Sequence, residues 1–287
     1  MRIFNGKKAA QKILRELANE IKKEKLRPSL AVILVGDNEA SKLYIKLKKE
    51  AAIKIGVQIQ EFCFNDQIKE EMIVQKIKEL NEDKDIHAII VQMPLPAIFN
   101  TERILGVISA HKDVDGFNKE NRQLSEKGRT PHFLPVLPLA ILTALADAVE
   151  NNLENLKDKN ILALVNSEVF GSTLKFVLGK EGVLVRYQVR NTCIVLGIEK
   201  DILAADILIS VCGCPNLIKG EMIKKSAVLI DAGITRYHDG KVVGDVNQKE
   251  VKDKAAFLTP VPGGIGPLTV ALLLRNVYLA AKSFAEL

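Results

Sequence analysis

The stretch Ser29-Leu30-Ala31-Val32-Ile33-Leu34-Val35-Gly36 decides how the first half of the chain folds. Its apolar residues run without a break, so they lack the alternation of a strand that faces water on one side. Such a run, ended by glycine, is typical of a parallel strand covered by helices on both faces. Val57–Phe64 is also strand-like, and Ile86–Gln92 predicts another buried strand.

Helical patterns separate these predicted strands. Lys7–Lys25 carries apolar residues at helical spacing, and Lys69–Asn81 is also predicted to be a helix. Ser41 is a suitable N-cap for a lysine-rich helix that runs to Ile55, and Gly56 is a suitable C-cap. Because strands and helices alternate, we expect an α/β unit with a mainly parallel sheet.

The second half repeats this organisation after a long connection. Lys112–Pro138 is rich in glycine, proline and polar residues, and Leu139–Asn151 is predicted to be a helix. The further expected elements are four strands and a helix: Ile161–Val165, Ser172–Lys180 (the helix), Val183–Tyr187, Ile207–Val211 and Ala227–Asp231. A last helix begins at about Thr269. The fold class is therefore α/β with two α/β domains, the second a Rossmann-like unit.

We expect the first domain to span residues 1–138 and to be completed by residues 269–287, because the C-terminal helix returns to it. The second domain would span residues 139–268.

Composition excludes several classes of protein. The chain has 287 residues with 47% hydrophobic and 26% charged side chains, which is typical of a globular protein and not of a disordered one. The N-terminal residues turn polar too early for the apolar region of a signal peptide, so none is expected. No stretch is expected to span a membrane, and we expect a cytoplasmic protein. The four cysteines form no CxxC pair, so reduced thiols and no metal site are expected. Net charge is 41 − 35 = +6, but aromatic residues are few and Trp is absent, so a nucleic-acid partner is not expected.

Three segments of the first half carry residues suited to chemistry. Tyr44 and Lys48 are four residues apart, so they share one helix face, although a lysine-rich face is usually only solvated surface. Gln92 ends a buried strand before two prolines. It stands either at the carboxyl edge of the sheet, where α/β proteins bind ligands, or as the cap of a turn. Lys112-Asp113-Val114-Asp115-Gly116 places two carboxylates in one turn, where an Asx-turn is the simpler interpretation.

Together these motifs resemble one known family from end to end. Tyr44-Ile45-x-x-Lys48, Val91-Gln92-x-Pro94-Leu95-Pro96, the Lys112–Gly116 turn and Thr259-Pro260-Val261-Pro262-Gly263-Gly264-x-Gly266-Pro267 occur in the order of the bifunctional methylenetetrahydrofolate dehydrogenase/methenyltetrahydrofolate cyclohydrolase family. Length and domain order match as well.

The resemblance implies roles for the matching positions. Lys48 would transfer the proton of the cyclohydrolase step, Gln92 would hold that lysine neutral, and Tyr44 would border the folate. Asp113 would bind the amino-pyrimidine edge of the pterin through paired hydrogen bonds. The rigid turn formed by Pro262, Gly263 and Gly264 would close on the folate.

The predicted dinucleotide loop departs from the family pattern Gly-Arg-Ser-x-x-Val-Gly-x-Pro. The chain reads Val165-Asn166-Ser167-Glu168-Val169-Phe170-Gly171-Ser172-Thr173, which keeps Ser167 and Gly171 but loses the first glycine and the arginine. Val189-Arg190 stands where the family often has a His-Ser or His-Arg pair. No acidic residue is present there to bind a ribose in the NAD manner, whereas Arg186 or Arg190 would suit a phosphate.

The resemblance therefore implies an enzyme of folate one-carbon metabolism. It would oxidise 5,10-methylenetetrahydrofolate with NADP, or with NAD, and hydrolyse the methenyl product to 10-formyltetrahydrofolate. The expected cofactor-binding residues are Asn166, Ser167, Gly171, Arg190 and Ile234. The resemblance also implies a homodimer. Because Val165, Asn166 and Val189 depart from the family pattern, a cyclohydrolase with weak or lost dehydrogenase activity and a non-catalytic folate-binding paralogue are the alternatives.

Overall fold

The computed structural model describes residues 1–127, 129–190, 192–237 and 239–286 of the chain. It divides into two compact units. The three-stranded unit comprises Ala10–Val136 and Val270–Leu287, and the six-stranded unit comprises Met1–Ala9 and Leu137–Thr269. The helices α1 (Gly6–Glu24) and α10 (Ile265–Ala285) have residues in both units.

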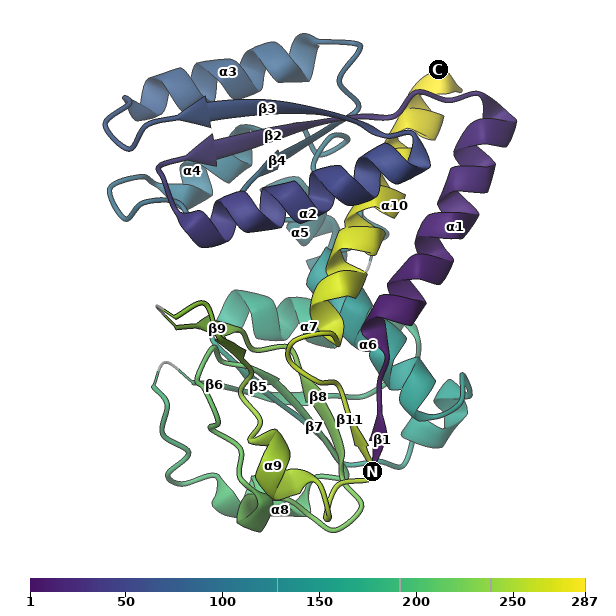
Figure 1. Ribbon diagram of the computed structural model, residues 1–287, viewed down its shortest axis with the longest axis vertical. Helices are drawn as coiled ribbons and strands as arrows, with labels where there is room; N and C mark the ends of the chain where they lie inside the picture. Colours follow the sequence, from purple (N-terminus) through teal and green to yellow (C-terminus); the bar gives the residue numbers. More distant parts are fainter. Residues whose placement is uncertain (128, 191, 238, 287) are drawn as a thin grey trace. The chain divides into compact units, whose positions relative to one another are not determined.

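The three-stranded unit is built on a parallel sheet of order β3-β2-β4. Its strands are β2 (Ser29–Val35), β3 (Gln58–Phe64) and β4 (Ala88–Val91), and β2, the central strand, is buried at every position. The chain leaves β2 toward β3 and then crosses back past β2 to β4. Since such crossovers are right-handed, α2 (Glu39–Ile55) and α3 (Glu70–Glu82) lie on opposite faces of the sheet (Figure 1).

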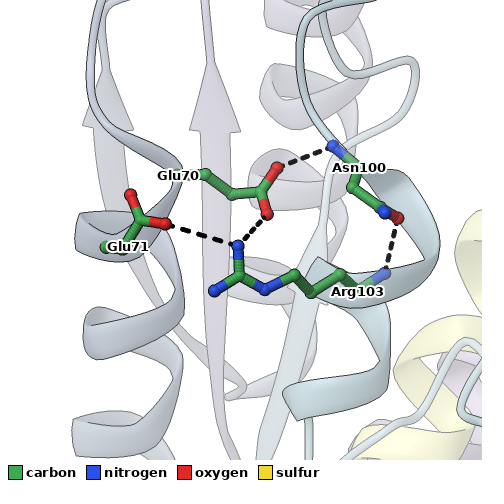
Figure 2. A network of polar contacts seen from close by, with 4 residues as sticks. All are labelled: Glu70, Glu71, Asn100 and Arg103. Atoms are coloured by element: carbon green, nitrogen blue, oxygen red, sulfur yellow. Dashed lines mark hydrogen bonds and ion pairs between the residues drawn. The ribbon is translucent and has the colours of Figure 1, made fainter.

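One face of this sheet carries the hydrophobic core beneath α3 and α4 (Thr101–Val107). A polar network joins the first turns of these two helices (Figure 2). Glu70 accepts the backbone N–H of Asn100 at 2.7 Å and pairs with the Arg103 guanidinium at 2.6 Å, while Asn100 caps α4. These contacts fix the helices that follow β3 and β4 against each other.

The C-terminal helix α10 is packed inside the three-stranded unit, as expected of a helix that returns to the first domain. Asn276 donates to the carbonyl of Val114 at 2.8 Å, and the Tyr278 hydroxyl donates to Glu24 on α1 at 2.8 Å. By length and composition α10 is apolar enough to cross a membrane, contrary to the expectation that no stretch would be. However, 61% of its apolar window is buried, which is typical of a core helix.

The six-stranded unit is a parallel sheet of order β1-β11-β8-β7-β5-β6 (Figure 1). The strands are β1 (Arg2–Ile3), β5 (Ile161–Val165), β6 (Arg186–Val189), β7 (Ile207–Val211), β8 (Val228–Asp231) and β11 (Phe257–Leu258). Residues 1–9, expected in the first domain, belong here because β1 pairs with β11. The expected α/β class, with a Rossmann-like second unit, is confirmed.

The strand order reverses between β5 and β7, and this reversal positions a candidate ligand edge. From β5 the chain passes through α7 (Glu168–Lys180) to β6, on one side of β5, and returns through α8 (Glu199–Ala204) to β7 on the other side. In open α/β sheets the crevice outside the carboxyl ends of strands at such a reversal is where ligands bind.

Several element boundaries differ from the sequence expectations. The helix α2 begins at Glu39 because Asn38, rather than Ser41, is its N-cap, whereas Gly56 is the expected left-handed C-cap. The predicted connection 112–138 contains a short helix, α5, and the start of α6. The remaining elements are α5 (Lys119–Glu126), α6 (Val136–Ala148), η1 (Leu153–Leu156), β9 (Thr235–Arg236), β10 (Val242–Val243), η2 (Gly220–Met222) and α9 (Gln248–Val251).

The cysteines also differ from expectation. Cys193 and Cys214 form a disulfide, whereas Cys63 and Cys212 are free. The expectation of four reduced thiols is therefore wrong for this pair. The sequence did not show it because the two residues are 21 positions apart and meet only through the sheet topology.

Candidate functional site

The structure brings Lys48 and Gln92 together. Lys48 lies on α2 and Gln92 directly follows β4, and the lysine Nζ donates to the Gln92 Oε1 at 3.0 Å. The other end of the amide is also fixed, because Gln92 Nε2 donates to the carbonyl of Met93 at 2.7 Å. The backbone N–H of Gln92 extends the strand pairing to Ile33. The amide oxygen is thus held toward the lysine by bonds that do not involve a ligand.

Burial tunes this lysine. Desolvation lowers the pKa of Lys48, and the negative charge of Asp115 opposes that shift. Burial likewise raises the pKa of Asp115, and the positive charge of Lys48 opposes it. Gln92, a neutral acceptor, holds the ammonium without adding a charge. A lysine in such surroundings is suited to exchanging a proton nearer neutral pH than a solvated lysine is.

Asp113 occupies a different position from the one expected of a ligand-binding carboxylate. One oxygen accepts the N–H of Gly116 at 3.2 Å, and the other accepts from Asn118 at 2.6 Å and from Asn121 at 3.1 Å. Only 2% of Asp113 is exposed, and burial raises its pKa to about 6. The carboxylate is therefore committed to folding the turn, although its backbone bonds reach three and five residues ahead rather than the two residues of an Asx-turn.

Asp115 is the carboxylate of this turn that faces Lys48, and our selection from the sequence omitted it. The turn that carries it is anchored at both ends. Lys112, 3% exposed, donates to the carbonyls of Leu80 and Asp83 at 2.9 and 2.7 Å. Gly116 has φ +79° and lies so close to Pro135 that a Cβ would come within 2.9 Å of its backbone. The pair of aspartates is the signal in the sequence, but spacing does not show which of the two faces the lysine.

Tyr44 lies on α2 one turn before Lys48 and is partly exposed. Both residues are on the helix face that the four-residue spacing predicts.

The turn at Pro262, Gly263 and Gly264 belongs to the six-stranded unit. Gly264 donates its N–H to the carbonyl of Pro260 at 2.7 Å, and Gly263 has φ +108°. Gly6, the first residue of α1, packs so closely on Gly264 that a Cβ on Gly6 would overlap its carbonyl oxygen. A Cβ on Gly264 would lie 2.6 Å from the Pro260 carbonyl oxygen, and the positive φ of Gly263 disfavours any other residue there, so the turn requires both glycines.

The loop after β5 starts α7 without the first glycine of the usual pattern. Ser167 is the N-cap, and its hydroxyl accepts the N–H of Phe170 at 3.3 Å. Asn166 is exposed at the carboxyl end of β5. Gly171 is required by packing, because a Cβ there would lie 2.4 Å from the Tyr187 ring. The Tyr187 hydroxyl in turn donates to Glu168, which adds a carboxylate to the first turn of α7.

Arg186 and Arg190 lie at opposite ends of β6: Arg186 begins the strand and Arg190 directly follows it. Arg186 pairs with Leu162 near the amino end of β5, where it contacts Asn160 and Asp201, so it lies away from the ligand edge. Arg190 follows the pair Val165–Val189 at the carboxyl end and donates its backbone N–H to Val165.

Two buried aspartates organise the neighbouring loops at the carboxyl edge. Asp245 accepts the backbone N–H groups of Cys212 and Cys214, both at 2.7 Å. Asp231 accepts from Gly233, and burial raises its pKa to about 7. Ile234 follows on the same loop with an exposed side chain. The loop 212–214 lies at the strand reversal, although the residues selected from the sequence did not include it.

The fold and the site first define a class of protein. It is an α/β protein in which one unit has the dinucleotide-binding topology and the other holds a half-buried lysine beside a glutamine and an aspartate. Residues 4–115 match the model of the tetrahydrofolate dehydrogenase/cyclohydrolase catalytic domain. Residues 135–285 match the NAD(P)-binding domain of the same enzymes. The chain belongs to the tetrahydrofolate dehydrogenase/cyclohydrolase family.

Relatives match along the whole length. The bifunctional protein FolD of Nautilia profundicola is 38% identical over 293 residues, which cover 100% of this chain and 99% of the relative. The crystal structure of the FolD dehydrogenase/cyclohydrolase from Campylobacter jejuni has a TM-score of 0.89 at 35% identity and covers 99% of both chains. The Trypanosoma brucei FolD structure, complexed with NADP cofactor and inhibitor, has a TM-score of 0.89 at 29% identity and covers 99% of this chain and 98% of that one.

Proposed function

We propose that the protein is a bifunctional enzyme of folate one-carbon metabolism, which oxidises 5,10-methylenetetrahydrofolate and hydrolyses the resulting methenyl cation to 10-formyltetrahydrofolate. The observation that carries the proposal is the Lys48–Gln92 hydrogen bond beside Asp115, within a chain whose relatives match over its full length. Lys48 comes from α2, Gln92 directly follows β4, and Asp115 lies in the turn 112–116. Gln92 is held in place by its own bond to the carbonyl of Met93.

In the hydrolysis, Lys48 is the proton carrier. Its neutral amine accepts a proton from the water that adds to the methenyl carbon. The ammonium then returns a proton to the ring nitrogen as the carbon–nitrogen bond opens, and the added hydroxyl loses its proton to solvent as the formyl C=O bond forms. The net reaction releases one proton for each water consumed. Gln92 orients the amine through its Oε1, and burial keeps the neutral form accessible.

For the substrate contacts we propose Tyr44 and Asp115, and we assign Asp113 to the folding of the turn. Asp115 is the carboxylate left to pair with a polar ring edge, because the oxygens of Asp113 already accept three N–H groups. Pro262, Gly263 and Gly264 stay as proposed folate-binding residues of the rigid turn.

Three features of the six-stranded unit fit a nicotinamide dinucleotide: its strand topology, the Ser167 N-cap of α7 and the close packing of Gly171. Ser167, Asn166 and Arg190 would hold it, with Ile234 bordering it from the loop after β8. When bound, the dinucleotide supplies the hydride acceptor for the oxidation. We propose NADP because Arg190, rather than a carboxylate, stands at the end of β6.

The experiment that tests this assignment is the dehydrogenase rate measured with NADP and with NAD side by side, together with the cyclohydrolase rate. We expect both activities and a preference for NADP. Hydrolysis without detectable oxidation would instead support a cyclohydrolase that has lost the dehydrogenase step. Val165 and the Glu168 carboxylate favour this hypothesis. Absence of both activities with folate still bound would support a non-catalytic paralogue.

We further propose a cytoplasmic homodimer that acts on folate and has no nucleic-acid or membrane partner. Part of the +6 charge then lies on the lysine-rich helix α2, near a substrate that carries carboxylates. Sedimentation of the purified protein tests the dimer.

A further inference from the structure

The Cys193–Cys214 disulfide joins two loops that lie on either side of β5. Cys193 is in the loop after β6, and Cys214 is in the loop after β7. Because β5 lies between these two strands, their axes are about 10 Å apart, which is two strand spacings. The Cα atoms of the two cysteines are only 5.3 Å apart. The bridge therefore draws the loops together past the carboxyl end of β5.

This position matters for a dinucleotide. A dinucleotide bound in the crevice between β5 and β7 extends its adenosine half toward the end of β6. A ring held between two chain segments needs about 7 Å, that is, two van der Waals contacts of about 3.5 Å. The 5.3 Å between the bridged Cα atoms leaves no space for adenine between the loops.

The two loops are held unequally. Asp245 fixes the loop after β7 by accepting the N–H groups of Cys212 and Cys214. In the loop after β6, among the described residues, no backbone N–H of residues 192–196 donates to another backbone group. Ile194 and Leu196 are 53% and 74% exposed. The disulfide is thus the strongest tie on the loop after β6, and breaking it frees that loop while leaving its partner in place.

We propose that Cys193–Cys214 is a thiol–disulfide exchange site that closes the dinucleotide end of the six-stranded unit when oxidised and opens it when reduced by a dithiol. The proposal rests on the proposed function, because it concerns the dinucleotide site of that enzyme. In the exchange, a dithiol reductant gives up two electrons and two protons to the protein disulfide and becomes a disulfide itself. The protein sulfur–sulfur bond breaks, and Cys193 and Cys214 each become thiols.

The exposure of the cysteines sets the order of events. Cys193 is exposed, so the reductant thiolate attacks its sulfur, and the buried Cys214 is the leaving group. The nearby Cys212 does not replace the reductant, because burial and the charge of Asp245 raise its pKa to about 11 and leave little thiolate.

A consequence follows for the two activities. The Lys48 site lies in the other unit and carries no cysteine of this pair. The redox state of the bridge should therefore change dinucleotide binding and oxidation but not the hydrolysis of methenyltetrahydrofolate.

The test compares the oxidised protein with the protein reduced by dithiothreitol and freed of it by gel filtration under argon. Thiol titration under denaturing conditions should give two free thiols in the oxidised form and four in the reduced form. Calorimetric titration with NADP should give a dissociation constant at least roughly tenfold lower for the reduced form. The cyclohydrolase rate should be the same in both forms.

Two variants complete the design. Cys193→Ser should bind NADP like the reduced protein in either condition. Cys63→Ser, which removes the exposed free cysteine of β3, is the matched control and should respond to dithiothreitol like the unsubstituted chain.

Four free thiols in the air-exposed protein would overturn the proposal, as would equal NADP affinity in the two forms or no NADP binding in either. Loss of oxidation in both forms with tenfold different NADP binding would contradict the proposed dehydrogenase activity but support the exchange site.

Discussion

Replacing Gln92 by methionine removes the hydrogen bond to Lys48 while keeping the length of the side chain. The bond joins Lys48 Nζ to the Gln92 Oε1 at 3.0 Å in partly buried surroundings. A hydrogen bond to a charged group contributes about 1.5–3 kcal/mol, and about 1.4 kcal/mol corresponds to a tenfold change in rate. We expect the kcat/KM of methenyltetrahydrofolate hydrolysis to fall by roughly ten- to hundredfold in Gln92→Met.

The assay follows loss of methenyl absorbance over a range of pH. Gln92→Glu is the companion variant: its carboxylate favours the ammonium, so the pKa of Lys48 rises and the ascending limb of the pH profile moves to higher pH. Gln75→Met, on the exposed surface of α3, is the control and should leave the rate unchanged. A Gln92→Met rate within twofold of the unsubstituted enzyme, or an unmoved profile for Gln92→Glu, would refute the reasoning.

Three further predictions concern the turn and the six-stranded unit. Asp113→Asn should lower the free energy of unfolding by about 1–3 kcal/mol, since the Asp113 carboxylate accepts three N–H groups. Asp115→Asn should instead lower turnover with little change in the urea midpoint of unfolding. The reverse pattern would contradict our assignment. Because the pKa of Asp231 is raised to about 7 in the folded protein, the folded state binds the extra proton, and the stability from this group falls as pH rises from about 4 to 7. Urea unfolding across that range should show the destabilisation by Asp231→Asn shrinking as pH rises; a constant difference would count against the raised pKa. Gly171→Ala should destabilise by about 1–3 kcal/mol through overlap with the Tyr187 ring, and Tyr187→Ala should relieve most of this added cost, which a double-mutant cycle measures; simple additivity would exclude the contact.

The buried strands could be predicted closely from the sequence. Ile161–Val165 and Ile207–Val211 are continuous apolar runs, and the structure has them with the same bounds. A strand covered on both faces leaves such a run as its local signature. The pairing of β1 with β11 had no such signal, because two-residue strands more than 250 positions apart depend on tertiary contacts.

The candidate site could be predicted only in part, for the same reason. The sequence indicates Lys48 and Gln92 in separate segments, and the structure places them in hydrogen-bond contact. The choice between Asp113 and Asp115 depended on which side chain turns toward the backbone of residues 116–118, and sequence spacing does not record that. The helix α7 begins at Glu168 rather than at the predicted Ser172, because Ser167 caps it although the first glycine of the family pattern is missing.

The central claim is that Lys48 carries the proton in hydrolysis, and Lys48→Ala tests it most directly. The measurement is the rate of methenyltetrahydrofolate hydrolysis by this variant, with folate binding measured on the same preparation. We predict that hydrolysis falls to the non-enzymatic rate while folate still binds. Hydrolysis at the full enzymatic rate by Lys48→Ala would contradict the account.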